Sequence, residues 1–157
     1  MDQPIISKYK TLLLNIGTKQ DHAEIYALLD EIEALSYHSG GDVEKSVRGA
    51  CSKITSRSIR EIFLSMSNDL KITSIIDIKK EIAAMYPVLI TVAVSLNESA
   101  IADIISWLKH SASEYAFLDL YVDPSILGGI LLSVNGVYKD FSINGALSSL
   151  DLRLIAL

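Results

Sequence analysis

Two adjacent glycines, Gly128 and Gly129, interrupt an apolar run and constrain the fold of this chain more than any other feature. Glycine weakens a strand because it loses the most conformational entropy on folding and packs no side chain. Two glycines in a row therefore indicate a bulge, a sharp bend or a place where another backbone comes very close. The sequence predicts that the chain bends here.

Turn signals lie on both sides of the glycines. Asp123-Pro124-Ser125 precedes them; proline fixes its own φ, and an aspartate side chain can cap a turn. Asn135-Gly136 follows between two apolar runs, which is the strongest short signal for a two-residue hairpin. The segment thus predicts a turn, a bent strand, a tight hairpin and a second strand in succession.

This segment resembles the C-terminal signature of the delta subunit of F-type ATP synthases, a family called OSCP in mitochondria. That signature reads Val-Asp-Pro-Ser, two aliphatic residues, Gly-Gly, an apolar strand, a short turn, then Asp-x-Ser and an aliphatic residue before a closing helix. The residues that match it at the family's spacing are Val122, Asp123, Pro124, Ser125, Gly128, Gly129, Asp140, Ser142 and Ile143. Together with the Asn135-Gly136 turn, we interpret them as a structural motif.

The first 85 residues are predicted to be helical, because their apolar residues recur with the period of an amphipathic helix. Gly17 and Gly40-Gly41 are expected to end two of these helices, and a last helix is expected over residues 74–85. The apolar positions of the first two helices are Ile5, Ile6, Tyr9, Leu12, Leu13 and Ile16, then Ile25, Leu28, Leu29, Ile32 and Leu35.

A helix break is predicted at residues 55–58. Val47, Ala50 and Ile54 share one face of a helical wheel, whereas the apolar positions from Ile59 onward are rotated by roughly 120°. One straight helix could not bury both faces against one core, so we expect two helices here. The first half of the chain is thus predicted to be a bundle of about five short helices.

After Pro87, which disfavours a helical conformation for the residue before it, the pattern changes. The run 88–94 is rich in β-branched residues and has no charge, so it predicts a buried strand. Ser95-x-x-Glu98 matches a capping box and predicts the start of a helix.

A strand over 116–122, the hairpin and a helix from Ser142 to about Ile155 complete the predicted order. The predicted fold class is α+β, mostly α: an N-terminal antiparallel helical bundle followed by a small βαββα domain. We expect the bundle over residues 1–86 and the second domain over residues 88–157.

Composition excludes several classes of protein. A net charge of −5 argues against a nucleic-acid binder, whose surface is usually basic. Half of the residues are hydrophobic, yet no apolar run reaches the roughly 20 residues that a membrane-spanning helix needs. We therefore expect no direct membrane insertion and assign the excess apolar surface to protein partners.

Cysteine usage and the start of the chain fit a cytoplasmic protein. Cys51 is the only cysteine, so no intramolecular disulfide is expected, and its place near an apolar helix face favours a small core residue over a nucleophile. The first residues have no basic region or cleavage pattern, so we expect no secretory signal.

The sequence indicates neither a phosphate-binding loop nor a metal site. No Walker or Gly-x-Gly-x-x-Gly pattern occurs, and His22, His38 and His110 are scattered. Asp123 and Asp140 could form an acid–base pair, but two turn aspartates that fix a hairpin are the favoured interpretation. We expect no catalytic residue, no metal and no cofactor.

A run of basic residues without an intervening acid precedes and follows the predicted helix break. A solvated helix face is the favoured interpretation, and contact with an acidic partner segment is the alternative. These residues are Lys45, Arg48, Lys53, Arg57 and Arg60.

The resemblance implies a non-catalytic role. In that family the delta subunit is the joint at the top of the peripheral stalk, which keeps the catalytic head of the proton- or sodium-translocating complex from turning with the rotor. Its helical bundle receives the N-terminal helix of an alpha subunit, and its second domain holds the C-terminal helices of the b subunit. The resemblance implies a peripheral position at the cytoplasmic face of the cell membrane.

In the family, the N-terminal helix of the alpha subunit lies in a groove between the first and fifth bundle helices, a helix-in-groove contact. Mapped onto this sequence, the groove would use exposed members of residues 5–16 and 59–66, with Tyr9 and Phe63 as anchors. The predicted partner-binding residues are Ile5, Tyr9, Leu12, Ile59, Phe63 and Met66.

Two alternatives remain from the sequence. The E subunit of vacuolar or archaeal-type ATPases, another stator, also has a Gly-Gly strand before its closing helix, but short helices broken at Gly17 and Gly40-Gly41 argue against its long N-terminal helix. A small-ligand-binding domain that uses the glycine turn is the second alternative, and it lacks a converging set of polar residues.

Overall fold

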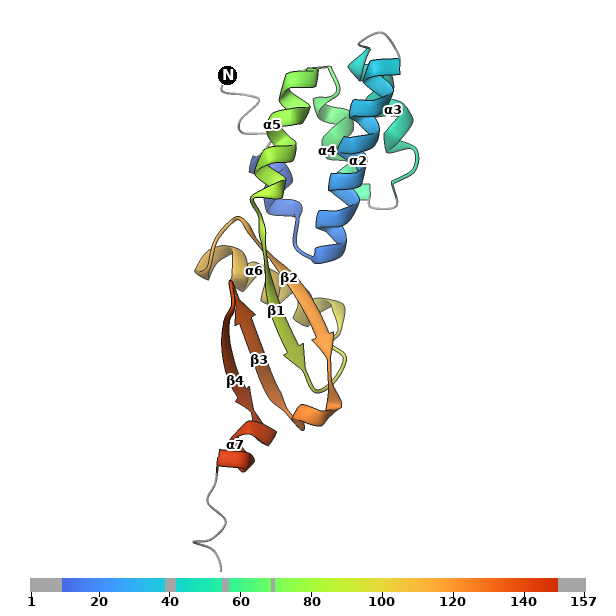
Figure 1. Cartoon of the computed structure of the whole chain (residues 1–157). Coiled ribbons are helices and arrows are strands. Elements are labelled where there is room, and N and C mark those ends of the chain that lie inside the picture. The colour runs from blue at the N-terminus through green and yellow to red at the C-terminus, as the bar shows by residue number, and fades with distance from the viewer. Residues whose placement is uncertain (1–9, 39–41, 55–56, 69, 150–157) are drawn as a thin grey trace, which may run out of the picture.

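The computed structural model describes residues 10–38, 42–54, 57–68 and 70–149. Helices come first along the chain, and a four-stranded sheet follows them (Figure 1). This confirms the predicted α+β, mostly α fold class. Residues 10–15 are helical. The named elements are α2 (Lys19–His38), α3 (Val43–Cys51), α4 (Arg57–Met66), α5 (Ile72–Ala83), β1 (Tyr86–Val92), α6 (Glu98–Ser111), β2 (Ala116–Val122), the 3-10 helix η1 (Pro124–Ile126), β3 (Gly129–Val134), β4 (Val137–Ser142) and α7 (Ile143–Ser149).

The helices share one hydrophobic core. α3 and α4 are separate helices, which confirms the predicted break, and both apolar stripes are buried: Val47 and Ala50 lie on the first, Ile59 and Phe63 on the second. Residues 55 and 56 of the predicted break lie outside the described residues, and α4 begins at Arg57.

The sheet has the strand order β2-β1-β3-β4, so all four predicted strands belong to one sheet. β1 and β2 are parallel and joined through α6, whereas β3 is antiparallel to both β1 and β4. β1 begins at Tyr86 and therefore includes Pro87. Pro87 is tolerated there because the ladder to β3 begins only at Val88, so its missing N–H interrupts no bond to that strand.

α6 begins at Glu98, and its N-cap differs from the predicted one. Asn97 caps it, because the Asn97 side chain accepts a hydrogen bond of 2.8 Å from the Ala100 N–H. The capping box that starts at Ser95 was therefore wrong; asparagine caps a helix as well as serine does and stands closer to the helix. α6 packs on one face of the sheet against β2, over a core that includes Val88 and Leu118.

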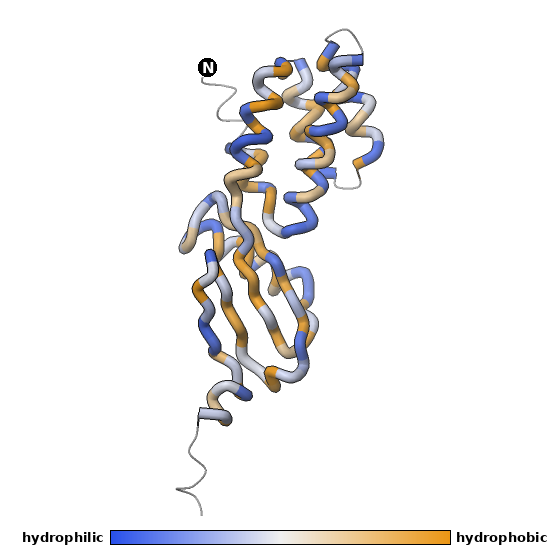
Figure 2. Tube along the Cα trace, in the orientation of Figure 1, coloured by the Kyte–Doolittle hydropathy of each residue, from blue (hydrophilic) through white to orange (hydrophobic). Residues whose placement is uncertain are grey.

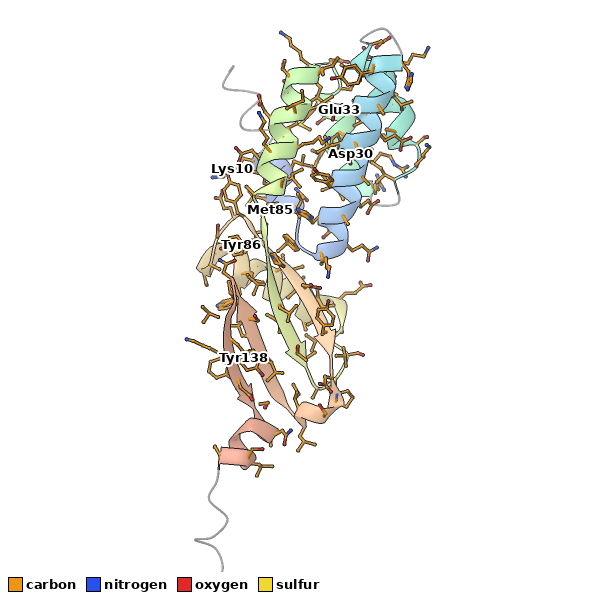
Figure 3. The ribbon with its side chains drawn as sticks, viewed as in Figure 1. Lys10, Asp30, Glu33, Met85, Tyr86 and Tyr138 are labelled. Atoms are coloured by element: carbon orange, nitrogen blue, oxygen red, sulfur yellow. The ribbon has the colours of Figure 1, made fainter. Side chains whose placement is uncertain are left out.

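The helical part and the sheet meet at β2, an edge strand. The Leu118 N–H donates to the Gly17 carbonyl at 2.8 Å, and Thr18 forms a parallel bridge with Leu118. At the same end of the sheet, Met85 and Tyr86 lie where the chain runs from α5 into β1 (Figure 3). The two parts are thus joined covalently, through the edge of β2, and through α6, whose Lys109 Nζ donates to the Leu13 carbonyl at 3.2 Å.

Side chains reinforce this junction. The Lys19 ammonium lies 2.9 Å from the Asp119 carboxylate. The His22 ring stacks on Phe117 with 4.6 Å between centroids and its Nε2 lies 3.0 Å from the Ile82 carbonyl. Phe117 is a residue of β2, yet it is buried in the core of the helices.

Because Phe117 extends the helical core from the sheet, Phe117→Ala is expected to lower the free energy of unfolding by about 3–5 kcal/mol. Urea denaturation of the intact chain, followed by circular dichroism, measures this loss. The control is Tyr121→Ala on the same face of β2, where the side chain is exposed and the expected loss is below about 1 kcal/mol. Equal losses from the two variants would contradict the shared core.

Candidate interaction site and its supporting hairpin

Gly129 is required by the backbone that passes next to it. Its φ is +76°, and a Cβ built there would lie 2.2 Å from the carbonyl oxygen of Phe141 on β4. No side chain fits at that distance, so β4 approaches β3 here more closely than any other residue type allows. Leu127, two residues earlier, also has a left-handed φ of 63° and is exposed. The chain therefore bends sharply between η1 and β3.

Two aspartates hold the turns on either side of the hairpin. Asp123 Oδ1 accepts the Ser125 N–H at 2.9 Å, and Asp140 Oδ1 accepts the Ser142 N–H at 2.8 Å. Hydrogen bonding by the side chains of Ser125 and Ser142, and then by their backbone N–H groups, favours the charged form and holds the pKa of each carboxyl below its ordinary value. Both carboxylates are thus engaged by backbone two residues downstream, as expected of turn aspartates.

The remaining turn residues complete the hairpin. Asn135 and Gly136 have φ values of 48° and 80°, both positive, as a type I′ hairpin turn requires. The Ser142 hydroxyl accepts the Gly145 N–H at 2.9 Å and so begins α7. The segment from η1 to α7 is therefore fixed by its own backbone and short side chains.

The structure separates the predicted partner-binding residues into two groups. Ile5 and Tyr9 lie outside the described residues. The other four are buried in the helical core, so the expectation that they present an exposed surface is wrong: Leu12, Ile59, Phe63 and Met66. The reason is that apolar residues at a regular helical period form the stripe that faces the protein's own core, so these side chains are buried by the other helices.

Exposed apolar side chains do occur in the same two segments, next to those stripes. Leu14 is 43% exposed and Leu64 is 42% exposed. Sequence reasoning passed over both because they fall outside the helical period. An apolar residue that is off the core-facing stripe is the signal that could have found them.

A groove of about 240 Å³ lies between α2 and α5 and is bridged by an ion cluster. Lys79 of α5 lies 2.5 Å from the Asp30 carboxylate and 2.6 Å from the Glu33 carboxylate. Asp30 and Glu33 both lie on α2 (Figure 3). These two hydrogen-bonded carboxylates raise the pKa of Lys79 above its ordinary value. The groove is therefore closed by ion pairs that link α2 and α5.

Most of the basic run around the helix break is used locally. Arg48 pairs with Glu44 and Arg57 with Glu61, each at 2.8 Å, while Lys53 pairs with Glu31. Such exposed pairs contribute little to stability. They agree with a solvated helix face.

The described residues carry little that points to catalysis. Burial raises the pKa of the Cys51 thiol to about 11, which keeps it protonated and unreactive. His22 is used at the junction, and His110 Nδ1 lies 2.7 Å from the Ser106 carbonyl. Among these residues no three His, Cys, Asp or Glu side chains converge as metal ligands.

The family model of the ATP synthase delta (OSCP) subunit matches residues 69–154. This stretch is more than half of the chain and contains α5, the whole sheet and the hairpin. The chain belongs to the ATP synthase delta (OSCP) subunit family.

Comparison with solved structures found a chain of the Toxoplasma gondii mitochondrial ATP synthase hexamer, determined by cryo-electron microscopy. It is 12% identical, with 95% of this chain and 96% of that chain covered, and the TM-score is 0.36. A comparison with curated proteins gave no match.

The motif residues that led to the family resemblance lie in the second half of this chain, inside the stretch that the family model matches. The Asp-Pro-Ser turn, the glycine pair and the Asp-x-Ser cap all fall inside residues 69–154.

No helix in the part of the chain that the structure describes has both the length and the hydropathy of a membrane span.

The close approach at Gly129 predicts a large effect of a single methyl group. Gly129→Ala is expected to lower the free energy of unfolding by about 3 kcal/mol or more, through the overlap with the Phe141 carbonyl and the left-handed φ. Gly136→Ala is the control, since it has a similar φ but meets nothing within 4 Å; its expected loss is about 1–2 kcal/mol. Chemical denaturation separates the two, and similar losses would show that the approach to Phe141 is unimportant.

The lowered pKa of Asp140 predicts a pH dependence of stability. Because the folded-state pKa lies below the unfolded value of 3.8, the carboxylate contributes stability above that value and loses it as the pH falls through the folded-state pKa. Asp140→Asn should therefore destabilise the protein at neutral pH and reduce the loss of thermal midpoint between about pH 5 and pH 2. An acid limb identical to that of the wild type would contradict the role of this carboxylate.

Proposed function

We propose that this protein is a non-catalytic peripheral-stalk (stator) component of an F-type ATP synthase, which links the alpha subunits of the catalytic head to the stalk formed by the b subunits. The observation that carries the proposal is the match of the delta (OSCP) family to residues 69–154. The proposal includes a peripheral position at the cytoplasmic face of the membrane and a proton- or sodium-translocating complex.

The two parts of the chain are assigned different partners. Residues 1–86 bind the catalytic head, and residues 88–157 bind the stalk. A stator must resist torque, so its two attachments need a stiff connection between them. The Gly17–Leu118 hydrogen bond, the Lys19–Asp119 ion pair and the stacking of His22 on Phe117 support such a connection.

The head-binding surface is assigned to the exposed apolar side chains beside the helical core. Leu14 and Leu64 are the described candidates in the two segments that the family resemblance implicates. An amphipathic helix from the N-terminus of the alpha subunit would cover them with its apolar face, which is the usual form of helix-in-groove binding. Phe63 is fully buried in the helical core, so it would not touch the partner.

A synthetic peptide that carries the N-terminal helix of the alpha subunit from the same organism is expected to bind the intact chain in isothermal titration calorimetry. Leu64→Ser should weaken binding about tenfold or more, since a central apolar contact contributes about 1.4 kcal/mol or more to binding. Tyr37→Ser serves as the control, because Tyr37 is exposed on a different helix, α2, and this variant should leave the affinity unchanged.

The calorimetric outcomes separate two failures. No heat of binding at high micromolar concentrations of wild-type protein would overturn the assignment of the helical part to the head. Equal affinities of the wild type and Leu64→Ser would retain the partner but move its contact away from α4.

A further inference from the structure

Lys109 is a partly buried lysine of α6 whose ammonium joins three segments of the chain. Its Nζ donates to the Leu13 carbonyl at 3.2 Å and to the Glu114 carbonyl at 2.8 Å. Leu13 belongs to the helical residues 10–15, and Glu114 lies in the loop between α6 and β2. One cation on the helix that covers the sheet therefore reaches across the junction to the helical part.

The acceptors of Lys109 are carbonyl oxygens, which attract a cation without neutralising it. The Leu13 carbonyl lies in the last turn of its helix and also accepts the Ile16 N–H at 3.2 Å. The C-terminal end of a helix carries a partial negative charge, so an ammonium is favoured next to it. A partial charge is weaker than the full charge of a carboxylate, and Lys109 therefore needs a counter-ion to offset its burial.

Two acidic side chains of the same junction are bound to other groups. The Glu114 carboxylate lies 3.0 Å from the Lys10 ammonium, and the Glu81 carboxylate accepts the Tyr115 hydroxyl at 2.7 Å. Figure 3 shows Lys10 at the place where the helical part meets the sheet. In the part of the chain that the structure describes, no carboxylate forms an ion pair with Lys109.

The other titratable groups of the junction are also engaged elsewhere. His110, the next residue of α6, has its Nδ1 2.7 Å from the Ser106 carbonyl of its own helix. On β2, the Asp119 carboxylate lies 2.9 Å from the Lys19 ammonium. Lys109 is thus buried against backbone carbonyls, while the acids around it serve other partners.

A cation that leaves water without a counter-ion is disfavoured relative to the neutral amine. Burial lowers the pKa of Lys109 to about 8, and the negative charge of Glu114 offsets only part of this effect. When the helical part moves away from α6, the side chain regains water and its pKa returns toward the ordinary value of 10.5. The separated arrangement therefore binds more protons than the closed one between about pH 8 and pH 10.5.

We propose that the contact of Lys109 with Leu13 makes the junction between the helical part and the sheet sensitive to pH, so that the closed arrangement is favoured as the pH rises. The closed arrangement holds fewer protons, so removal of protons from the solution favours it. The ratio of closed to separated molecules should rise about tenfold between pH 7 and pH 9 and change little below pH 7. This device is independent of the partners proposed above; in a stator it would make the connection between the two parts firmest in an alkaline compartment.

The first test follows the Cε atom of Lys109 in the intact chain by carbon-13 NMR as the pH is raised. The expected midpoint of the Lys109 titration is near pH 8. Lys19 is the internal control on the other side of the junction, because its hydrogen bond to Asp119 raises its pKa above the ordinary value of 10.5. A Lys109 midpoint at 10.5 or above would overturn the inference.

The second test measures hydrogen exchange of the Leu118 amide, which reports on the junction because this N–H donates to the Gly17 carbonyl. Its protection, corrected for the intrinsic exchange rate, is compared at pH 7 and pH 9 by pulse labelling. The increase should be about tenfold larger in the wild type than in Lys109→Met, which keeps the apolar part of the side chain but cannot bind a proton. Lys45→Met removes an exposed lysine of α3 and should behave as the wild type does.

The two tests together decide the inference. The same pH dependence of Leu118 protection in the wild type and in Lys109→Met would overturn it, even when Lys109 titrates near pH 8. Should Lys109→Met fail to fold, the wild type alone is decisive. Its Leu118 protection must begin to rise at the pH at which Lys109 begins to lose its proton, and a flat profile between pH 7 and pH 9 would overturn the proposed coupling.

Discussion

The alternation of side chains along β2 is the constraint on which the rest of the structure depends. Successive residues of a strand point to opposite faces, so Phe117 enters the core of the helices while Leu118 enters the core beneath α6. The Leu118 N–H meanwhile binds the carbonyl of Gly17 at the strand edge. One strand therefore serves two cores, and a shift in its register by one residue would exchange them.

The sequence predicted those features that depend on local periodicity. The period of apolar residues located the core stripe of α2, the separate helices α3 and α4, and the limits of β2. Asn135-Gly136 specified the hairpin because few dipeptides adopt two positive φ values in succession. Hydrophobic residues follow the strands through the middle of the sheet, in agreement with the predicted buried strand over residues 88–94 (Figure 2).

Features that depend on contacts between distant residues could not be predicted. Lys19 and Asp119 are a hundred positions apart, and nothing near either residue indicates the other. The same limit explains why residues expected at an exposed surface are buried. The apolar period that reveals an amphipathic helix does not show whether its apolar face packs in the protein's own core or binds another protein. Phe63 packs in the core. The position of a cap was missed for a simpler reason, since Asn97 and Ser95 are both good caps within one turn.

The direction of the strands has a mechanical consequence. β1 and β2 run along the long axis of the molecule, with the helices at one end and η1 and α7 at the other (Figure 1). A tension applied between those ends would act along the strands, so the hydrogen bonds between β1 and β2 would be loaded in shear. In that geometry they share the load and must fail together, whereas a force across the strands would break them one at a time. The parallel pairing of β1 with β2 thus gives the chain a stiff axis between its two ends.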